Sequence, residues 1–188
     1  MESQNKIPRL LLHCCCAPCA SYVLEFLSPL FDITVIFYNP NIRPGEEYQK
    51  RKSELHRLLS LVVYPNRVDM IDCGYCTEDF EDAARLFWKE PEGGRRCRAC
   101  FRLRLEETAK RAKSGEFDYF TTTLSVSPHK DAALLNEIGS ELAIEYGVEY
   151  LYSNFKKRDG YKRSIELSKQ YGLYRQSYCG CKAEQFKV

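Results

Sequence analysis

Short apolar segments alternate with helix-like segments along almost the whole chain, and this alternation restricts the possible fold more than any other feature. The apolar segments are mostly continuous runs, which is typical of a parallel sheet with helices on both faces. Strands are expected at residues 9–13, 32–38, 68–71, 117–123 and 149–152. Helices are expected at residues 20–27, 46–59, 77–88, 98–113, 128–146 and 161–171. With 188 residues, the chain can bury one α/β core over residues 1–188 without disulfide bridges.

The composition excludes several classes of protein. A chain that is 44% hydrophobic and 29% charged is not disordered. Its apolar runs are far shorter than the ~20 residues that a membrane span needs, so no membrane partner is expected. Residues 1–9 lack the apolar stretch of a signal peptide. We therefore expect a cytoplasmic protein. Its net charge of +2 is compatible with nucleic-acid binding but does not argue for it.

Cysteine is the outlier, with 10 residues in the chain. In a reducing compartment these thiols stay free unless they bind a metal or perform redox chemistry. Cys15 and Cys16 follow the first predicted strand at the start of a helix, where unpaired N–H groups favour anionic sulfur. Cys97 and Cys100 begin another helix among several arginines, and cationic neighbours also lower a thiol pKa. Both pairs therefore suit thiolate chemistry. Two further pairs are Cys73/Cys76 and Cys179/Cys181.

Other interpretations of the cysteines need weighing. Cys14 is interpreted as a small buried residue, whereas for Cys19 burial and a chemical role are equally supported. The spacing Cys73-x2-Cys76 and Cys97-x2-Cys100 fits a four-cysteine zinc site, although the helix expected at 77–88 opposes a zinc ribbon. The Cys16-Ala17-Pro18-Cys19 segment could serve a general thiol oxidoreductase. A nucleotide-hydrolysing phosphate loop is disfavoured, because residues 14–19 contain no glycine.

Several segments together resemble the QueH-type epoxyqueuosine reductases, from about Leu10 to Cys181. The joint presence of a Cys-Cys pair, a CxxC and a C-terminal CGC makes this resemblance specific. The matching segments are residues 12–19, 37–41, 46–48, 90–94, 96–101, 120–124, 127–128 and 173–181. Cys73 and Cys76 are not part of the pattern.

The resemblance implies a Rossmann-like fold related to the PP-loop and adenine nucleotide hydrolase group. It implies an iron–sulfur oxidoreductase that reduces epoxyqueuosine to queuosine at the wobble position of tRNA without cobalamin. The ligands of a [4Fe–4S] cluster would be Cys15, Cys16, Cys97 and Cys100. The redox-active pair would be Cys179 and Cys181, on a tail that closes over the metal site.

The implied reaction needs two electrons and two protons, and no ordinary side chain supplies electrons. A small one-electron donor is therefore an expected partner. Cys179 and Cys181 could form a dithiol/disulfide couple or hold a second metal ion, such as iron, that helps the epoxide oxygen to leave. Candidate proton donors are His13, Tyr38, His129 and Tyr178, although an interior, non-catalytic imidazole is favoured for His13.

For tRNA, the distribution of charge is more informative than the net charge. One basic cluster surrounds Cys97, and a second lies at residues 156–163. The 13 tyrosines offer faces on which an unpaired base can stack. The alternative function is a zinc-stabilised nucleic-acid-binding module without catalysis.

Overall fold

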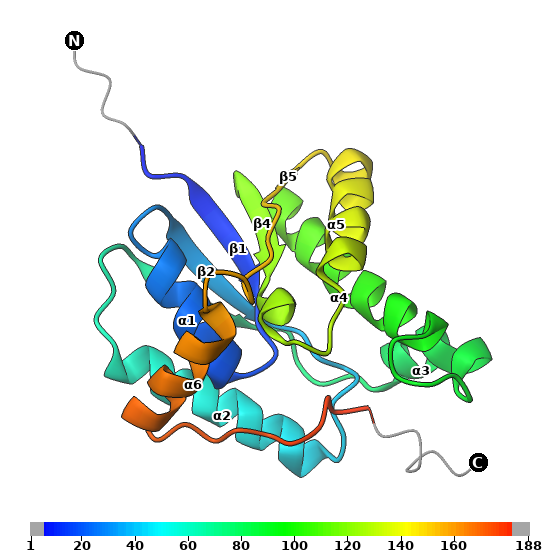
Figure 1. Ribbon diagram of the computed structural model, residues 1–188. Coiled ribbons are helices and arrows are strands. Elements are labelled where there is room, and N and C mark those ends of the chain that lie inside the picture. Colours follow the sequence, from blue (N-terminus) through cyan, green and yellow to red (C-terminus); the bar gives the residue numbers. More distant parts are fainter. Residues whose placement is uncertain (1–5, 182–188) are drawn as a thin grey trace.

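Five parallel strands form the central sheet, in the order β3-β2-β1-β4-β5. The computed structural model describes residues 6–181, and Figure 1 shows the strands side by side with helices around them. This is the strand order of the doubly wound Rossmann type, so the predicted fold class is confirmed. The strands are β1 (Arg9–His13), β2 (Asp32–Phe37), β3 (Val68–Asp72), β4 (Tyr119–Thr122) and β5 (Glu149–Tyr150).

Strand β1 lies at the centre because apolar side chains cover both of its faces. Leu10 and Leu12 pack into the core on one side of the sheet, and Leu11 packs into the core on the other. All three side chains are fully buried. A strand with this pattern can only be stable between two layers of helices, as the continuous apolar run predicts.

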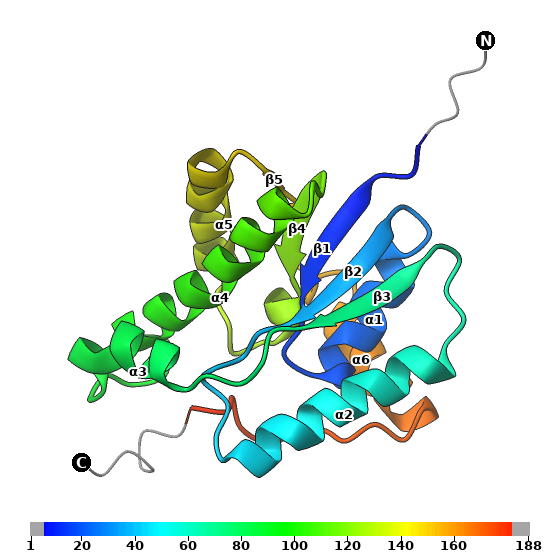
Figure 2. The ribbon, with the colours of Figure 1, turned by 180° about the vertical axis from the view of Figure 1, so that it is seen from behind.

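The two helical layers are visible when Figures 1 and 2 are compared. One layer consists of α1 (Ala17–Leu27), α2 (Gly45–Leu61) and α6 (Gly160–Gln170). The other consists of α3 (Glu78–Ala84), α4 (Arg95–Ser114) and α5 (Ala132–Tyr146), with α3 packed on α4. Two short 3-10 helices, Arg85–Phe87 and Thr123–Val126, complete the elements among residues 6–181. No helix in this part of the chain has both the length and the apolarity needed to cross a bilayer.

The predicted start of one helix is wrong. The Ser127-Pro128 pair was expected to begin it, but α5 begins at Ala132. The side chain of Asp131 is the N-cap, since it accepts hydrogen bonds from the backbone N–H groups of Ala133 and Leu134. Residues 127–131 instead form a turn after β4, so they lie at the carboxyl edge of the sheet.

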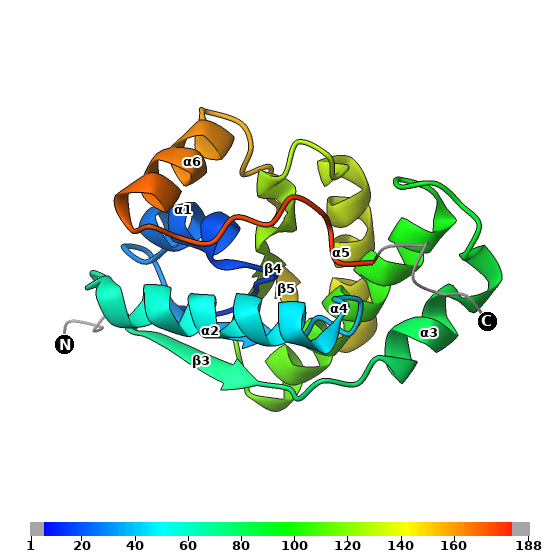
Figure 3. The ribbon, with the colours of Figure 1, turned by 90° about the horizontal axis from the view of Figure 1, so that it is seen from below.

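The C-terminal segment forms neither helix nor strand over residues 173–181. Figure 3 shows it running from α6 across the carboxyl edge of the sheet, between α2 and α1, towards the start of α4. Cys181 packs there against Cys100 and Phe80. The segment therefore brings the last cysteine pair to the other cysteine-bearing elements. Residues 182–188, and residues 1–5 of the predicted domain, lie outside the described residues.

Candidate metal centre

The cysteines after β1 lie at the point where the order of the strands reverses, which is the usual ligand site of such sheets. Two backbone contacts fix them there: the Cys14 N–H donates to the carbonyl of Ile36 at 3.0 Å, and the Asn39 amide donates to the Cys14 carbonyl at 2.9 Å. Cys16 is the N-cap of α1 and has an extended backbone. The predicted position of Cys15 and Cys16 at a strand-to-helix turn is confirmed.

Three sulfur atoms gather at this turn. The Sγ atoms of Cys15, Cys16 and Cys19 all lie within 4.8 Å of one another, which suits ligands of a metal. The Cys15 thiolate accepts hydrogen bonds from the thiols of Cys16 and Cys19, which hold its pKa well below the ordinary value. The same contact with Cys15 raises the pKa of Cys16 to about 12. The cluster therefore favours one anionic sulfur at Cys15. The sequence had left the role of Cys19 open.

Cys97 and Cys100 lie in the first two turns of α4, as predicted, and both are buried. The backbone N–H of Gly93 donates to Cys97 Sγ at 3.2 Å, and the positive φ of Gly93, +90°, is readily adopted only by glycine. Cys97 packs in the same apolar cluster as Cys15 and Cys16. Burial raises the pKa of Cys100 to about 11. Neither sulfur belongs to the tight three-sulfur group.

Cys179 and Cys181 interact electrostatically with the other cysteines. A hydrogen bond from the Cys181 thiol is the main cause that lowers the pKa of Cys179 to about 5, and Lys130 and Arg104 add to this effect. The charge of Cys179 contributes to the raised pKa of Cys100, and the charge of Cys100 contributes to the raised pKa of Cys181. The structure thus places the C-terminal pair next to α4 and near the turn after β1.

Two cations face these sulfur atoms without a carboxylate partner among residues 6–181. Arg104 is 1% exposed, and its Nη2 has no hydrogen-bond partner in the described structure. Burial disfavours the charged forms of Arg104 and Lys130, yet the electrostatic effect of nearby cysteines, above all Cys100 for Arg104 and Cys179 for Lys130, raises both pKa values. A buried cation favours a nearby anion, and the thiols of Cys15 and Cys179, whose pKa values are lowered, can supply one. The donor set therefore fits a metal group with thiolate ligands.

A cavity of about 480 Å³ opens onto this centre. Its volume lies within the range of small-molecule sites. Lys130 lies on its wall beside Cys15 and Cys179, while Tyr161, His129 and Gln176 form other parts of the lining. A buried group held by the cysteines would therefore meet a ligand that enters from solvent.

The predicted proton donors divide between two places. His129 and Tyr178 line the cavity. His13 is fully buried between the Thr122 hydroxyl and the Tyr38 carbonyl, and burial lowers its pKa to about 4. The Tyr38 hydroxyl donates to Asp79 at 2.7 Å, in a separate cavity of about 340 Å³. The non-catalytic interpretation of His13 agrees with these contacts.

The zinc template is not favoured. Cys73 is partly buried, and Cys76 is exposed. Within residues 6–181, neither belongs to a group of three or more His, Cys, Asp or Glu side chains close enough to share one ion. Cys76 Sγ instead donates to a Glu78 carboxylate oxygen at 3.3 Å.

The first basic cluster, which was one of two candidates for contact with tRNA, is not a free basic surface. Arg98 and Arg102 form ion pairs with three glutamates on α5, namely Glu137, Glu141 and Glu145. Arg96 and Arg104 are buried. The second cluster differs, because Lys157, Arg158 and Lys162 are exposed next to the cavity residue Tyr161.

Sequence reasoning missed Arg51, Arg104 and Lys130 as residues of the site. Arg51 and Arg104 lie within helices, where an arginine is normally exposed. Lys130 fell within the first turn of the helix that was expected to begin at residue 128, and it was not singled out. Only the apolar surroundings of Arg104 on α4, next to Phe101 and Leu105, gave a signal of burial.

A parallel Rossmann-like sheet with buried thiols and cations at its carboxyl edge defines an α/β protein with a candidate metal centre. The fold alone is similar to that of a predicted subunit of tRNA methyltransferase from Methanocaldococcus jannaschii. In that comparison the TM-score is 0.53 at 16% identity, and the match covers 85% of this chain and 74% of the other.

Sequence comparison identifies the particular family. The family model described as epoxyqueuosine reductase QueH matches residues 10–186. Proteins named epoxyqueuosine reductase QueH are 42% identical in Streptococcus pyogenes serotype M1 and 43% identical in Staphylococcus epidermidis. These matches cover 96% of this chain in both cases, and 71% and 77% of the relatives. The relative of that name from Thermotoga maritima is 35% identical over 92% of this chain and 88% of its own length. The chain belongs to the QueH family, so the resemblance seen in the sequence is confirmed.

Proposed function

We propose that this protein reduces epoxyqueuosine to queuosine in tRNA, without cobalamin, at an iron–sulfur centre held by its cysteines. The observation that carries the proposal is the cavity into which Cys15, Cys179 and Lys130 all face. Membership of the QueH family supplies the substrate class. The thiols and cations that face this cavity favour redox chemistry at sulfur-bound iron over simple hydrolysis.

The reaction removes the epoxide oxygen as water and leaves a carbon–carbon double bond. It consumes two electrons and two protons, and the electrons come from a small one-electron donor. Cys15, Cys16, Cys97 and Cys100 are proposed to hold a [4Fe–4S] cluster, which would supply single electrons when bound. Cys179 and Cys181 are proposed either to cycle between dithiol and disulfide or to hold a further iron ion. Cys19 is a further candidate ligand, because its Sγ lies in the same close group as those of Cys15 and Cys16.

Lys130 is proposed to act on the epoxide oxygen. Its ammonium group lies on the cavity wall, and the thiolates around it keep it protonated. An ammonium donor would stabilise the negative charge that develops on the oxygen as the carbon–oxygen bond breaks, and it can supply a proton there. His129, which lines the same cavity and is exposed to solvent, can carry protons to this position.

The nucleoside must leave the anticodon stack to reach a centre at the bottom of a cavity. Tyr161 lies at the cavity and offers an aromatic face for stacking. The exposed cations Lys157, Arg158 and Lys162 surround it in sequence and are proposed to bind the neighbouring phosphates. Of the two basic clusters that the sequence offered for tRNA binding, we therefore propose the second.

The test is anaerobic purification followed by iron, sulfide and zinc analysis, and then a nucleoside assay. The substrate is tRNA from a strain that lacks its own reductase. We expect iron and sulfide, an iron–sulfur absorbance band, and conversion of epoxyqueuosine to queuosine with a chemical reductant. Bound zinc without iron, together with unchanged epoxyqueuosine, would instead support the nucleic-acid-binding alternative.

Cysteine variants test the assignment of roles. Cys97→Ala should lose the absorbance band, whereas Cys179→Ala should keep it and lose turnover. Cys76→Ser is the matched control, because this exposed thiol lies outside the centre, and it should keep both. If the wild-type protein binds one more iron than Cys179→Ala, the C-terminal pair holds a metal. Equal iron contents indicate a dithiol/disulfide couple. Retained colour and activity in both Ala variants would refute the assignment.

A further inference from the structure

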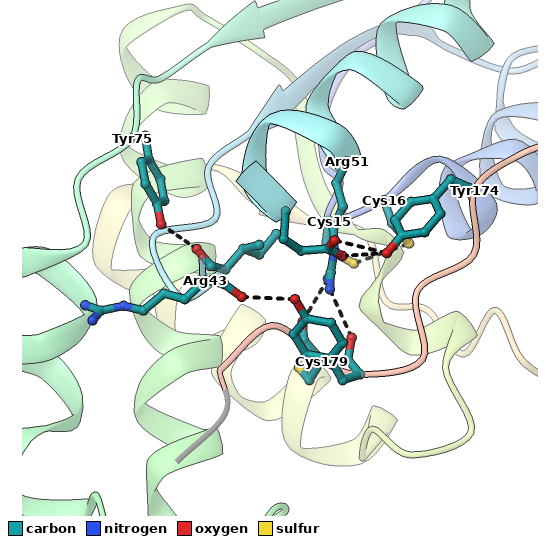
Figure 4. A network of polar contacts seen from close by, with 10 residues as sticks. Cys15, Cys16, Arg43, Arg51, Tyr75, Tyr174 and Cys179 are labelled. Atoms are coloured by element: carbon teal, nitrogen blue, oxygen red, sulfur yellow. Dashed lines mark hydrogen bonds and ion pairs between the residues drawn. The ribbon is translucent and has the colours of Figure 1, made fainter. Parts of the chain in front are cut away.

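The C-terminal segment carries two of the proposed functional cysteines, but it has little structure of its own. Residues 173–181 form no helix or strand, so other parts of the protein must fix the position of Cys179. Most of the contacts that do so come from α2 and the loop before it. The polar network is shown in Figure 4.

Arg51 of α2 is the centre of these contacts. Its side chain is 1% exposed, although arginine is rarely buried. Nη1 donates to the Cys179 carbonyl at 2.9 Å, and Nη2 donates to the Tyr178 carbonyl at 3.1 Å. The guanidinium therefore binds two consecutive carbonyls with its planar fork, as Figure 4 shows. The guanidinium carbon also lies 5.1 Å from the centre of the Tyr178 ring.

Two further residues orient Arg51. Its Nε donates to a Glu47 carboxylate oxygen at 2.6 Å, one helical turn earlier. The Tyr174 hydroxyl donates to the same carboxylate, with distances of 3.0 and 3.2 Å to its two oxygens. Glu47 thus neutralises the buried guanidinium and leaves its Nη1 and Nη2 groups free to bind the tail.

The loop before α2 holds the next residues of the tail. The Arg43 N–H donates to the Gly180 carbonyl at 3.1 Å, and the Tyr178 hydroxyl donates to the Arg43 carbonyl at 3.0 Å. Three consecutive carbonyls, from Tyr178 to Gly180, are therefore bound. Cys179 lies in the middle of this run, and its backbone is fixed on both sides.

We infer that Arg51, oriented by Glu47 and Tyr174, is a positioning residue that holds Cys179 at the centre during epoxyqueuosine reduction. This inference rests on the proposed function. Arg51 also lines the cavity, but its hydrogen bonds go to Glu47 and to the backbone of the tail. A lysine cannot replace it, because a single ammonium group cannot bind two carbonyls and a carboxylate in one plane.

The chain provides a matched control on the same helix. Arg57 pairs with Glu54 and donates to the carbonyls of Tyr171 and Gly172, at 3.1 and 2.9 Å. It binds the two residues that directly precede the C-terminal segment, with the same kind of fork. The carbonyls that Arg57 binds precede Cys179 by seven or more residues. Arg57→Lys therefore removes a similar pair of hydrogen bonds without displacing that cysteine.

The experiment compares Arg51→Lys, Arg57→Lys and the wild type as anaerobic, cluster-loaded proteins. The measurements are kcat and KM for tRNA, the cluster absorbance, and the rate of iodoacetamide labelling. Labelling is followed in the tryptic peptide of residues 176–182, which contains both Cys179 and Cys181. We expect Arg51→Lys to lose roughly 10²-fold in kcat, as small displacements of reacting groups do, with little change in KM. Its absorbance should remain, while labelling of the peptide accelerates. Arg57→Lys should match the wild type.

Equal labelling and kcat for the two arginine variants would overturn the inference, since a general structural role affects both alike. If Arg51→Lys does not fold, Tyr174→Phe decides, because it removes only the hydroxyl contact with Glu47. A smaller loss of kcat and faster labelling in Tyr174→Phe support the inference, and wild-type values of both overturn it. If the wild type itself reduces no epoxyqueuosine, the proposed function fails, whereas the labelling comparison still decides the positioning of the tail.

Discussion

The Gly180→Ala substitution places a single methyl group where the structure has no room for it. Gly180 has a φ of +124°, which an L side chain rarely adopts. A Cβ at this position would lie 3.0 Å from Ile42 Cγ1 and 3.2 Å from Ile42 Cα. Ile42 is fully buried and cannot move away easily. Backbone strain of this kind costs about 1–3 kcal/mol, before any displacement of the neighbouring loop.

This cost is large compared with the net stability of the docked tail. The two charged hydrogen bonds from Arg51 are worth about 1.5–3 kcal/mol each, and the Arg43 contact adds about 1 kcal/mol. Ordering the backbone of residues 177–181 costs about 1–2 kcal/mol per residue, which is comparable to the whole of that gain. A further cost of about 2 kcal/mol therefore lowers the ratio of docked to undocked tail by roughly 30-fold, because 1.4 kcal/mol corresponds to a factor of ten.

We expect Gly180→Ala to lower kcat by at least about tenfold and the melting temperature by less than about 3 °C, because detachment of the tail leaves the sheet intact. The assays are queuosine formation and thermal unfolding by circular dichroism. Gly172→Ala is the control: Gly172 directly precedes the segment and has a φ of +58°, but a Cβ there meets nothing within 4 Å. Its kcat should stay within about twofold of the wild type. Equal kcat values for the two variants would refute the reasoning.

Three other predictions concern the cavity, the tRNA surface and an unassigned thiol. Lys130→Met should lower single-turnover rates roughly 10²–10³-fold, as loss of one preorganised donor does, and Lys130→Arg should restore part of the loss. Arg158→Gln and Lys162→Gln should each reduce the salt dependence of tRNA affinity by roughly 0.7 in the log–log slope. Burial raises the pKa of Cys73 to about 11. Its labelling in a Cys76→Ser background should therefore rise roughly tenfold per pH unit between pH 8 and 10, because the thiolate fraction does.

Each of these predictions has its own control. For the salt slope, Lys169→Gln lies at the far end of α6 and should leave the slope unchanged; an equal change there indicates a general charge effect. For Lys130, full activity of the Met variant would exclude a role at the epoxide. For Cys73, the unfolded protein in guanidinium should show the ordinary thiol midpoint, and a plateau below pH 9.5 in the folded protein contradicts the effect of burial.

Local sequence patterns were sufficient for the architecture. The continuous apolar run of β1 required cover on both faces, and the alternation of strands and helices then allowed only a parallel sheet. The pattern failed at Ser127-Pro128, because a serine followed by proline resembles an N-cap whether or not the chain continues as a helix. The stronger cap, Asp131, decided where α5 begins.

The site was only partly predictable, for a physical reason. Whether a thiol lies at a helix start is a local property, so the positions of Cys16 and Cys97 follow from the sequence. Whether a cation is buried depends on what packs over it. Arg98 and Arg104 are near neighbours in sequence, yet one pairs with Glu137 at the surface and the other is enclosed without a carboxylate partner in the described part of the chain.

The sequence by itself determined the sheet, the helices that cover it, the helix-start positions of the thiols and the family. These features depend on residue periodicity and short-range spacing. Only the tertiary structure decided which side chains meet at the centre. Arg51 binds the carbonyl of a residue 128 positions away, and no local pattern encodes such a contact. The same folding exposes Lys130 to the cavity and pairs Arg98 with Glu137, because long-range packing sets which charges lose water and which keep it.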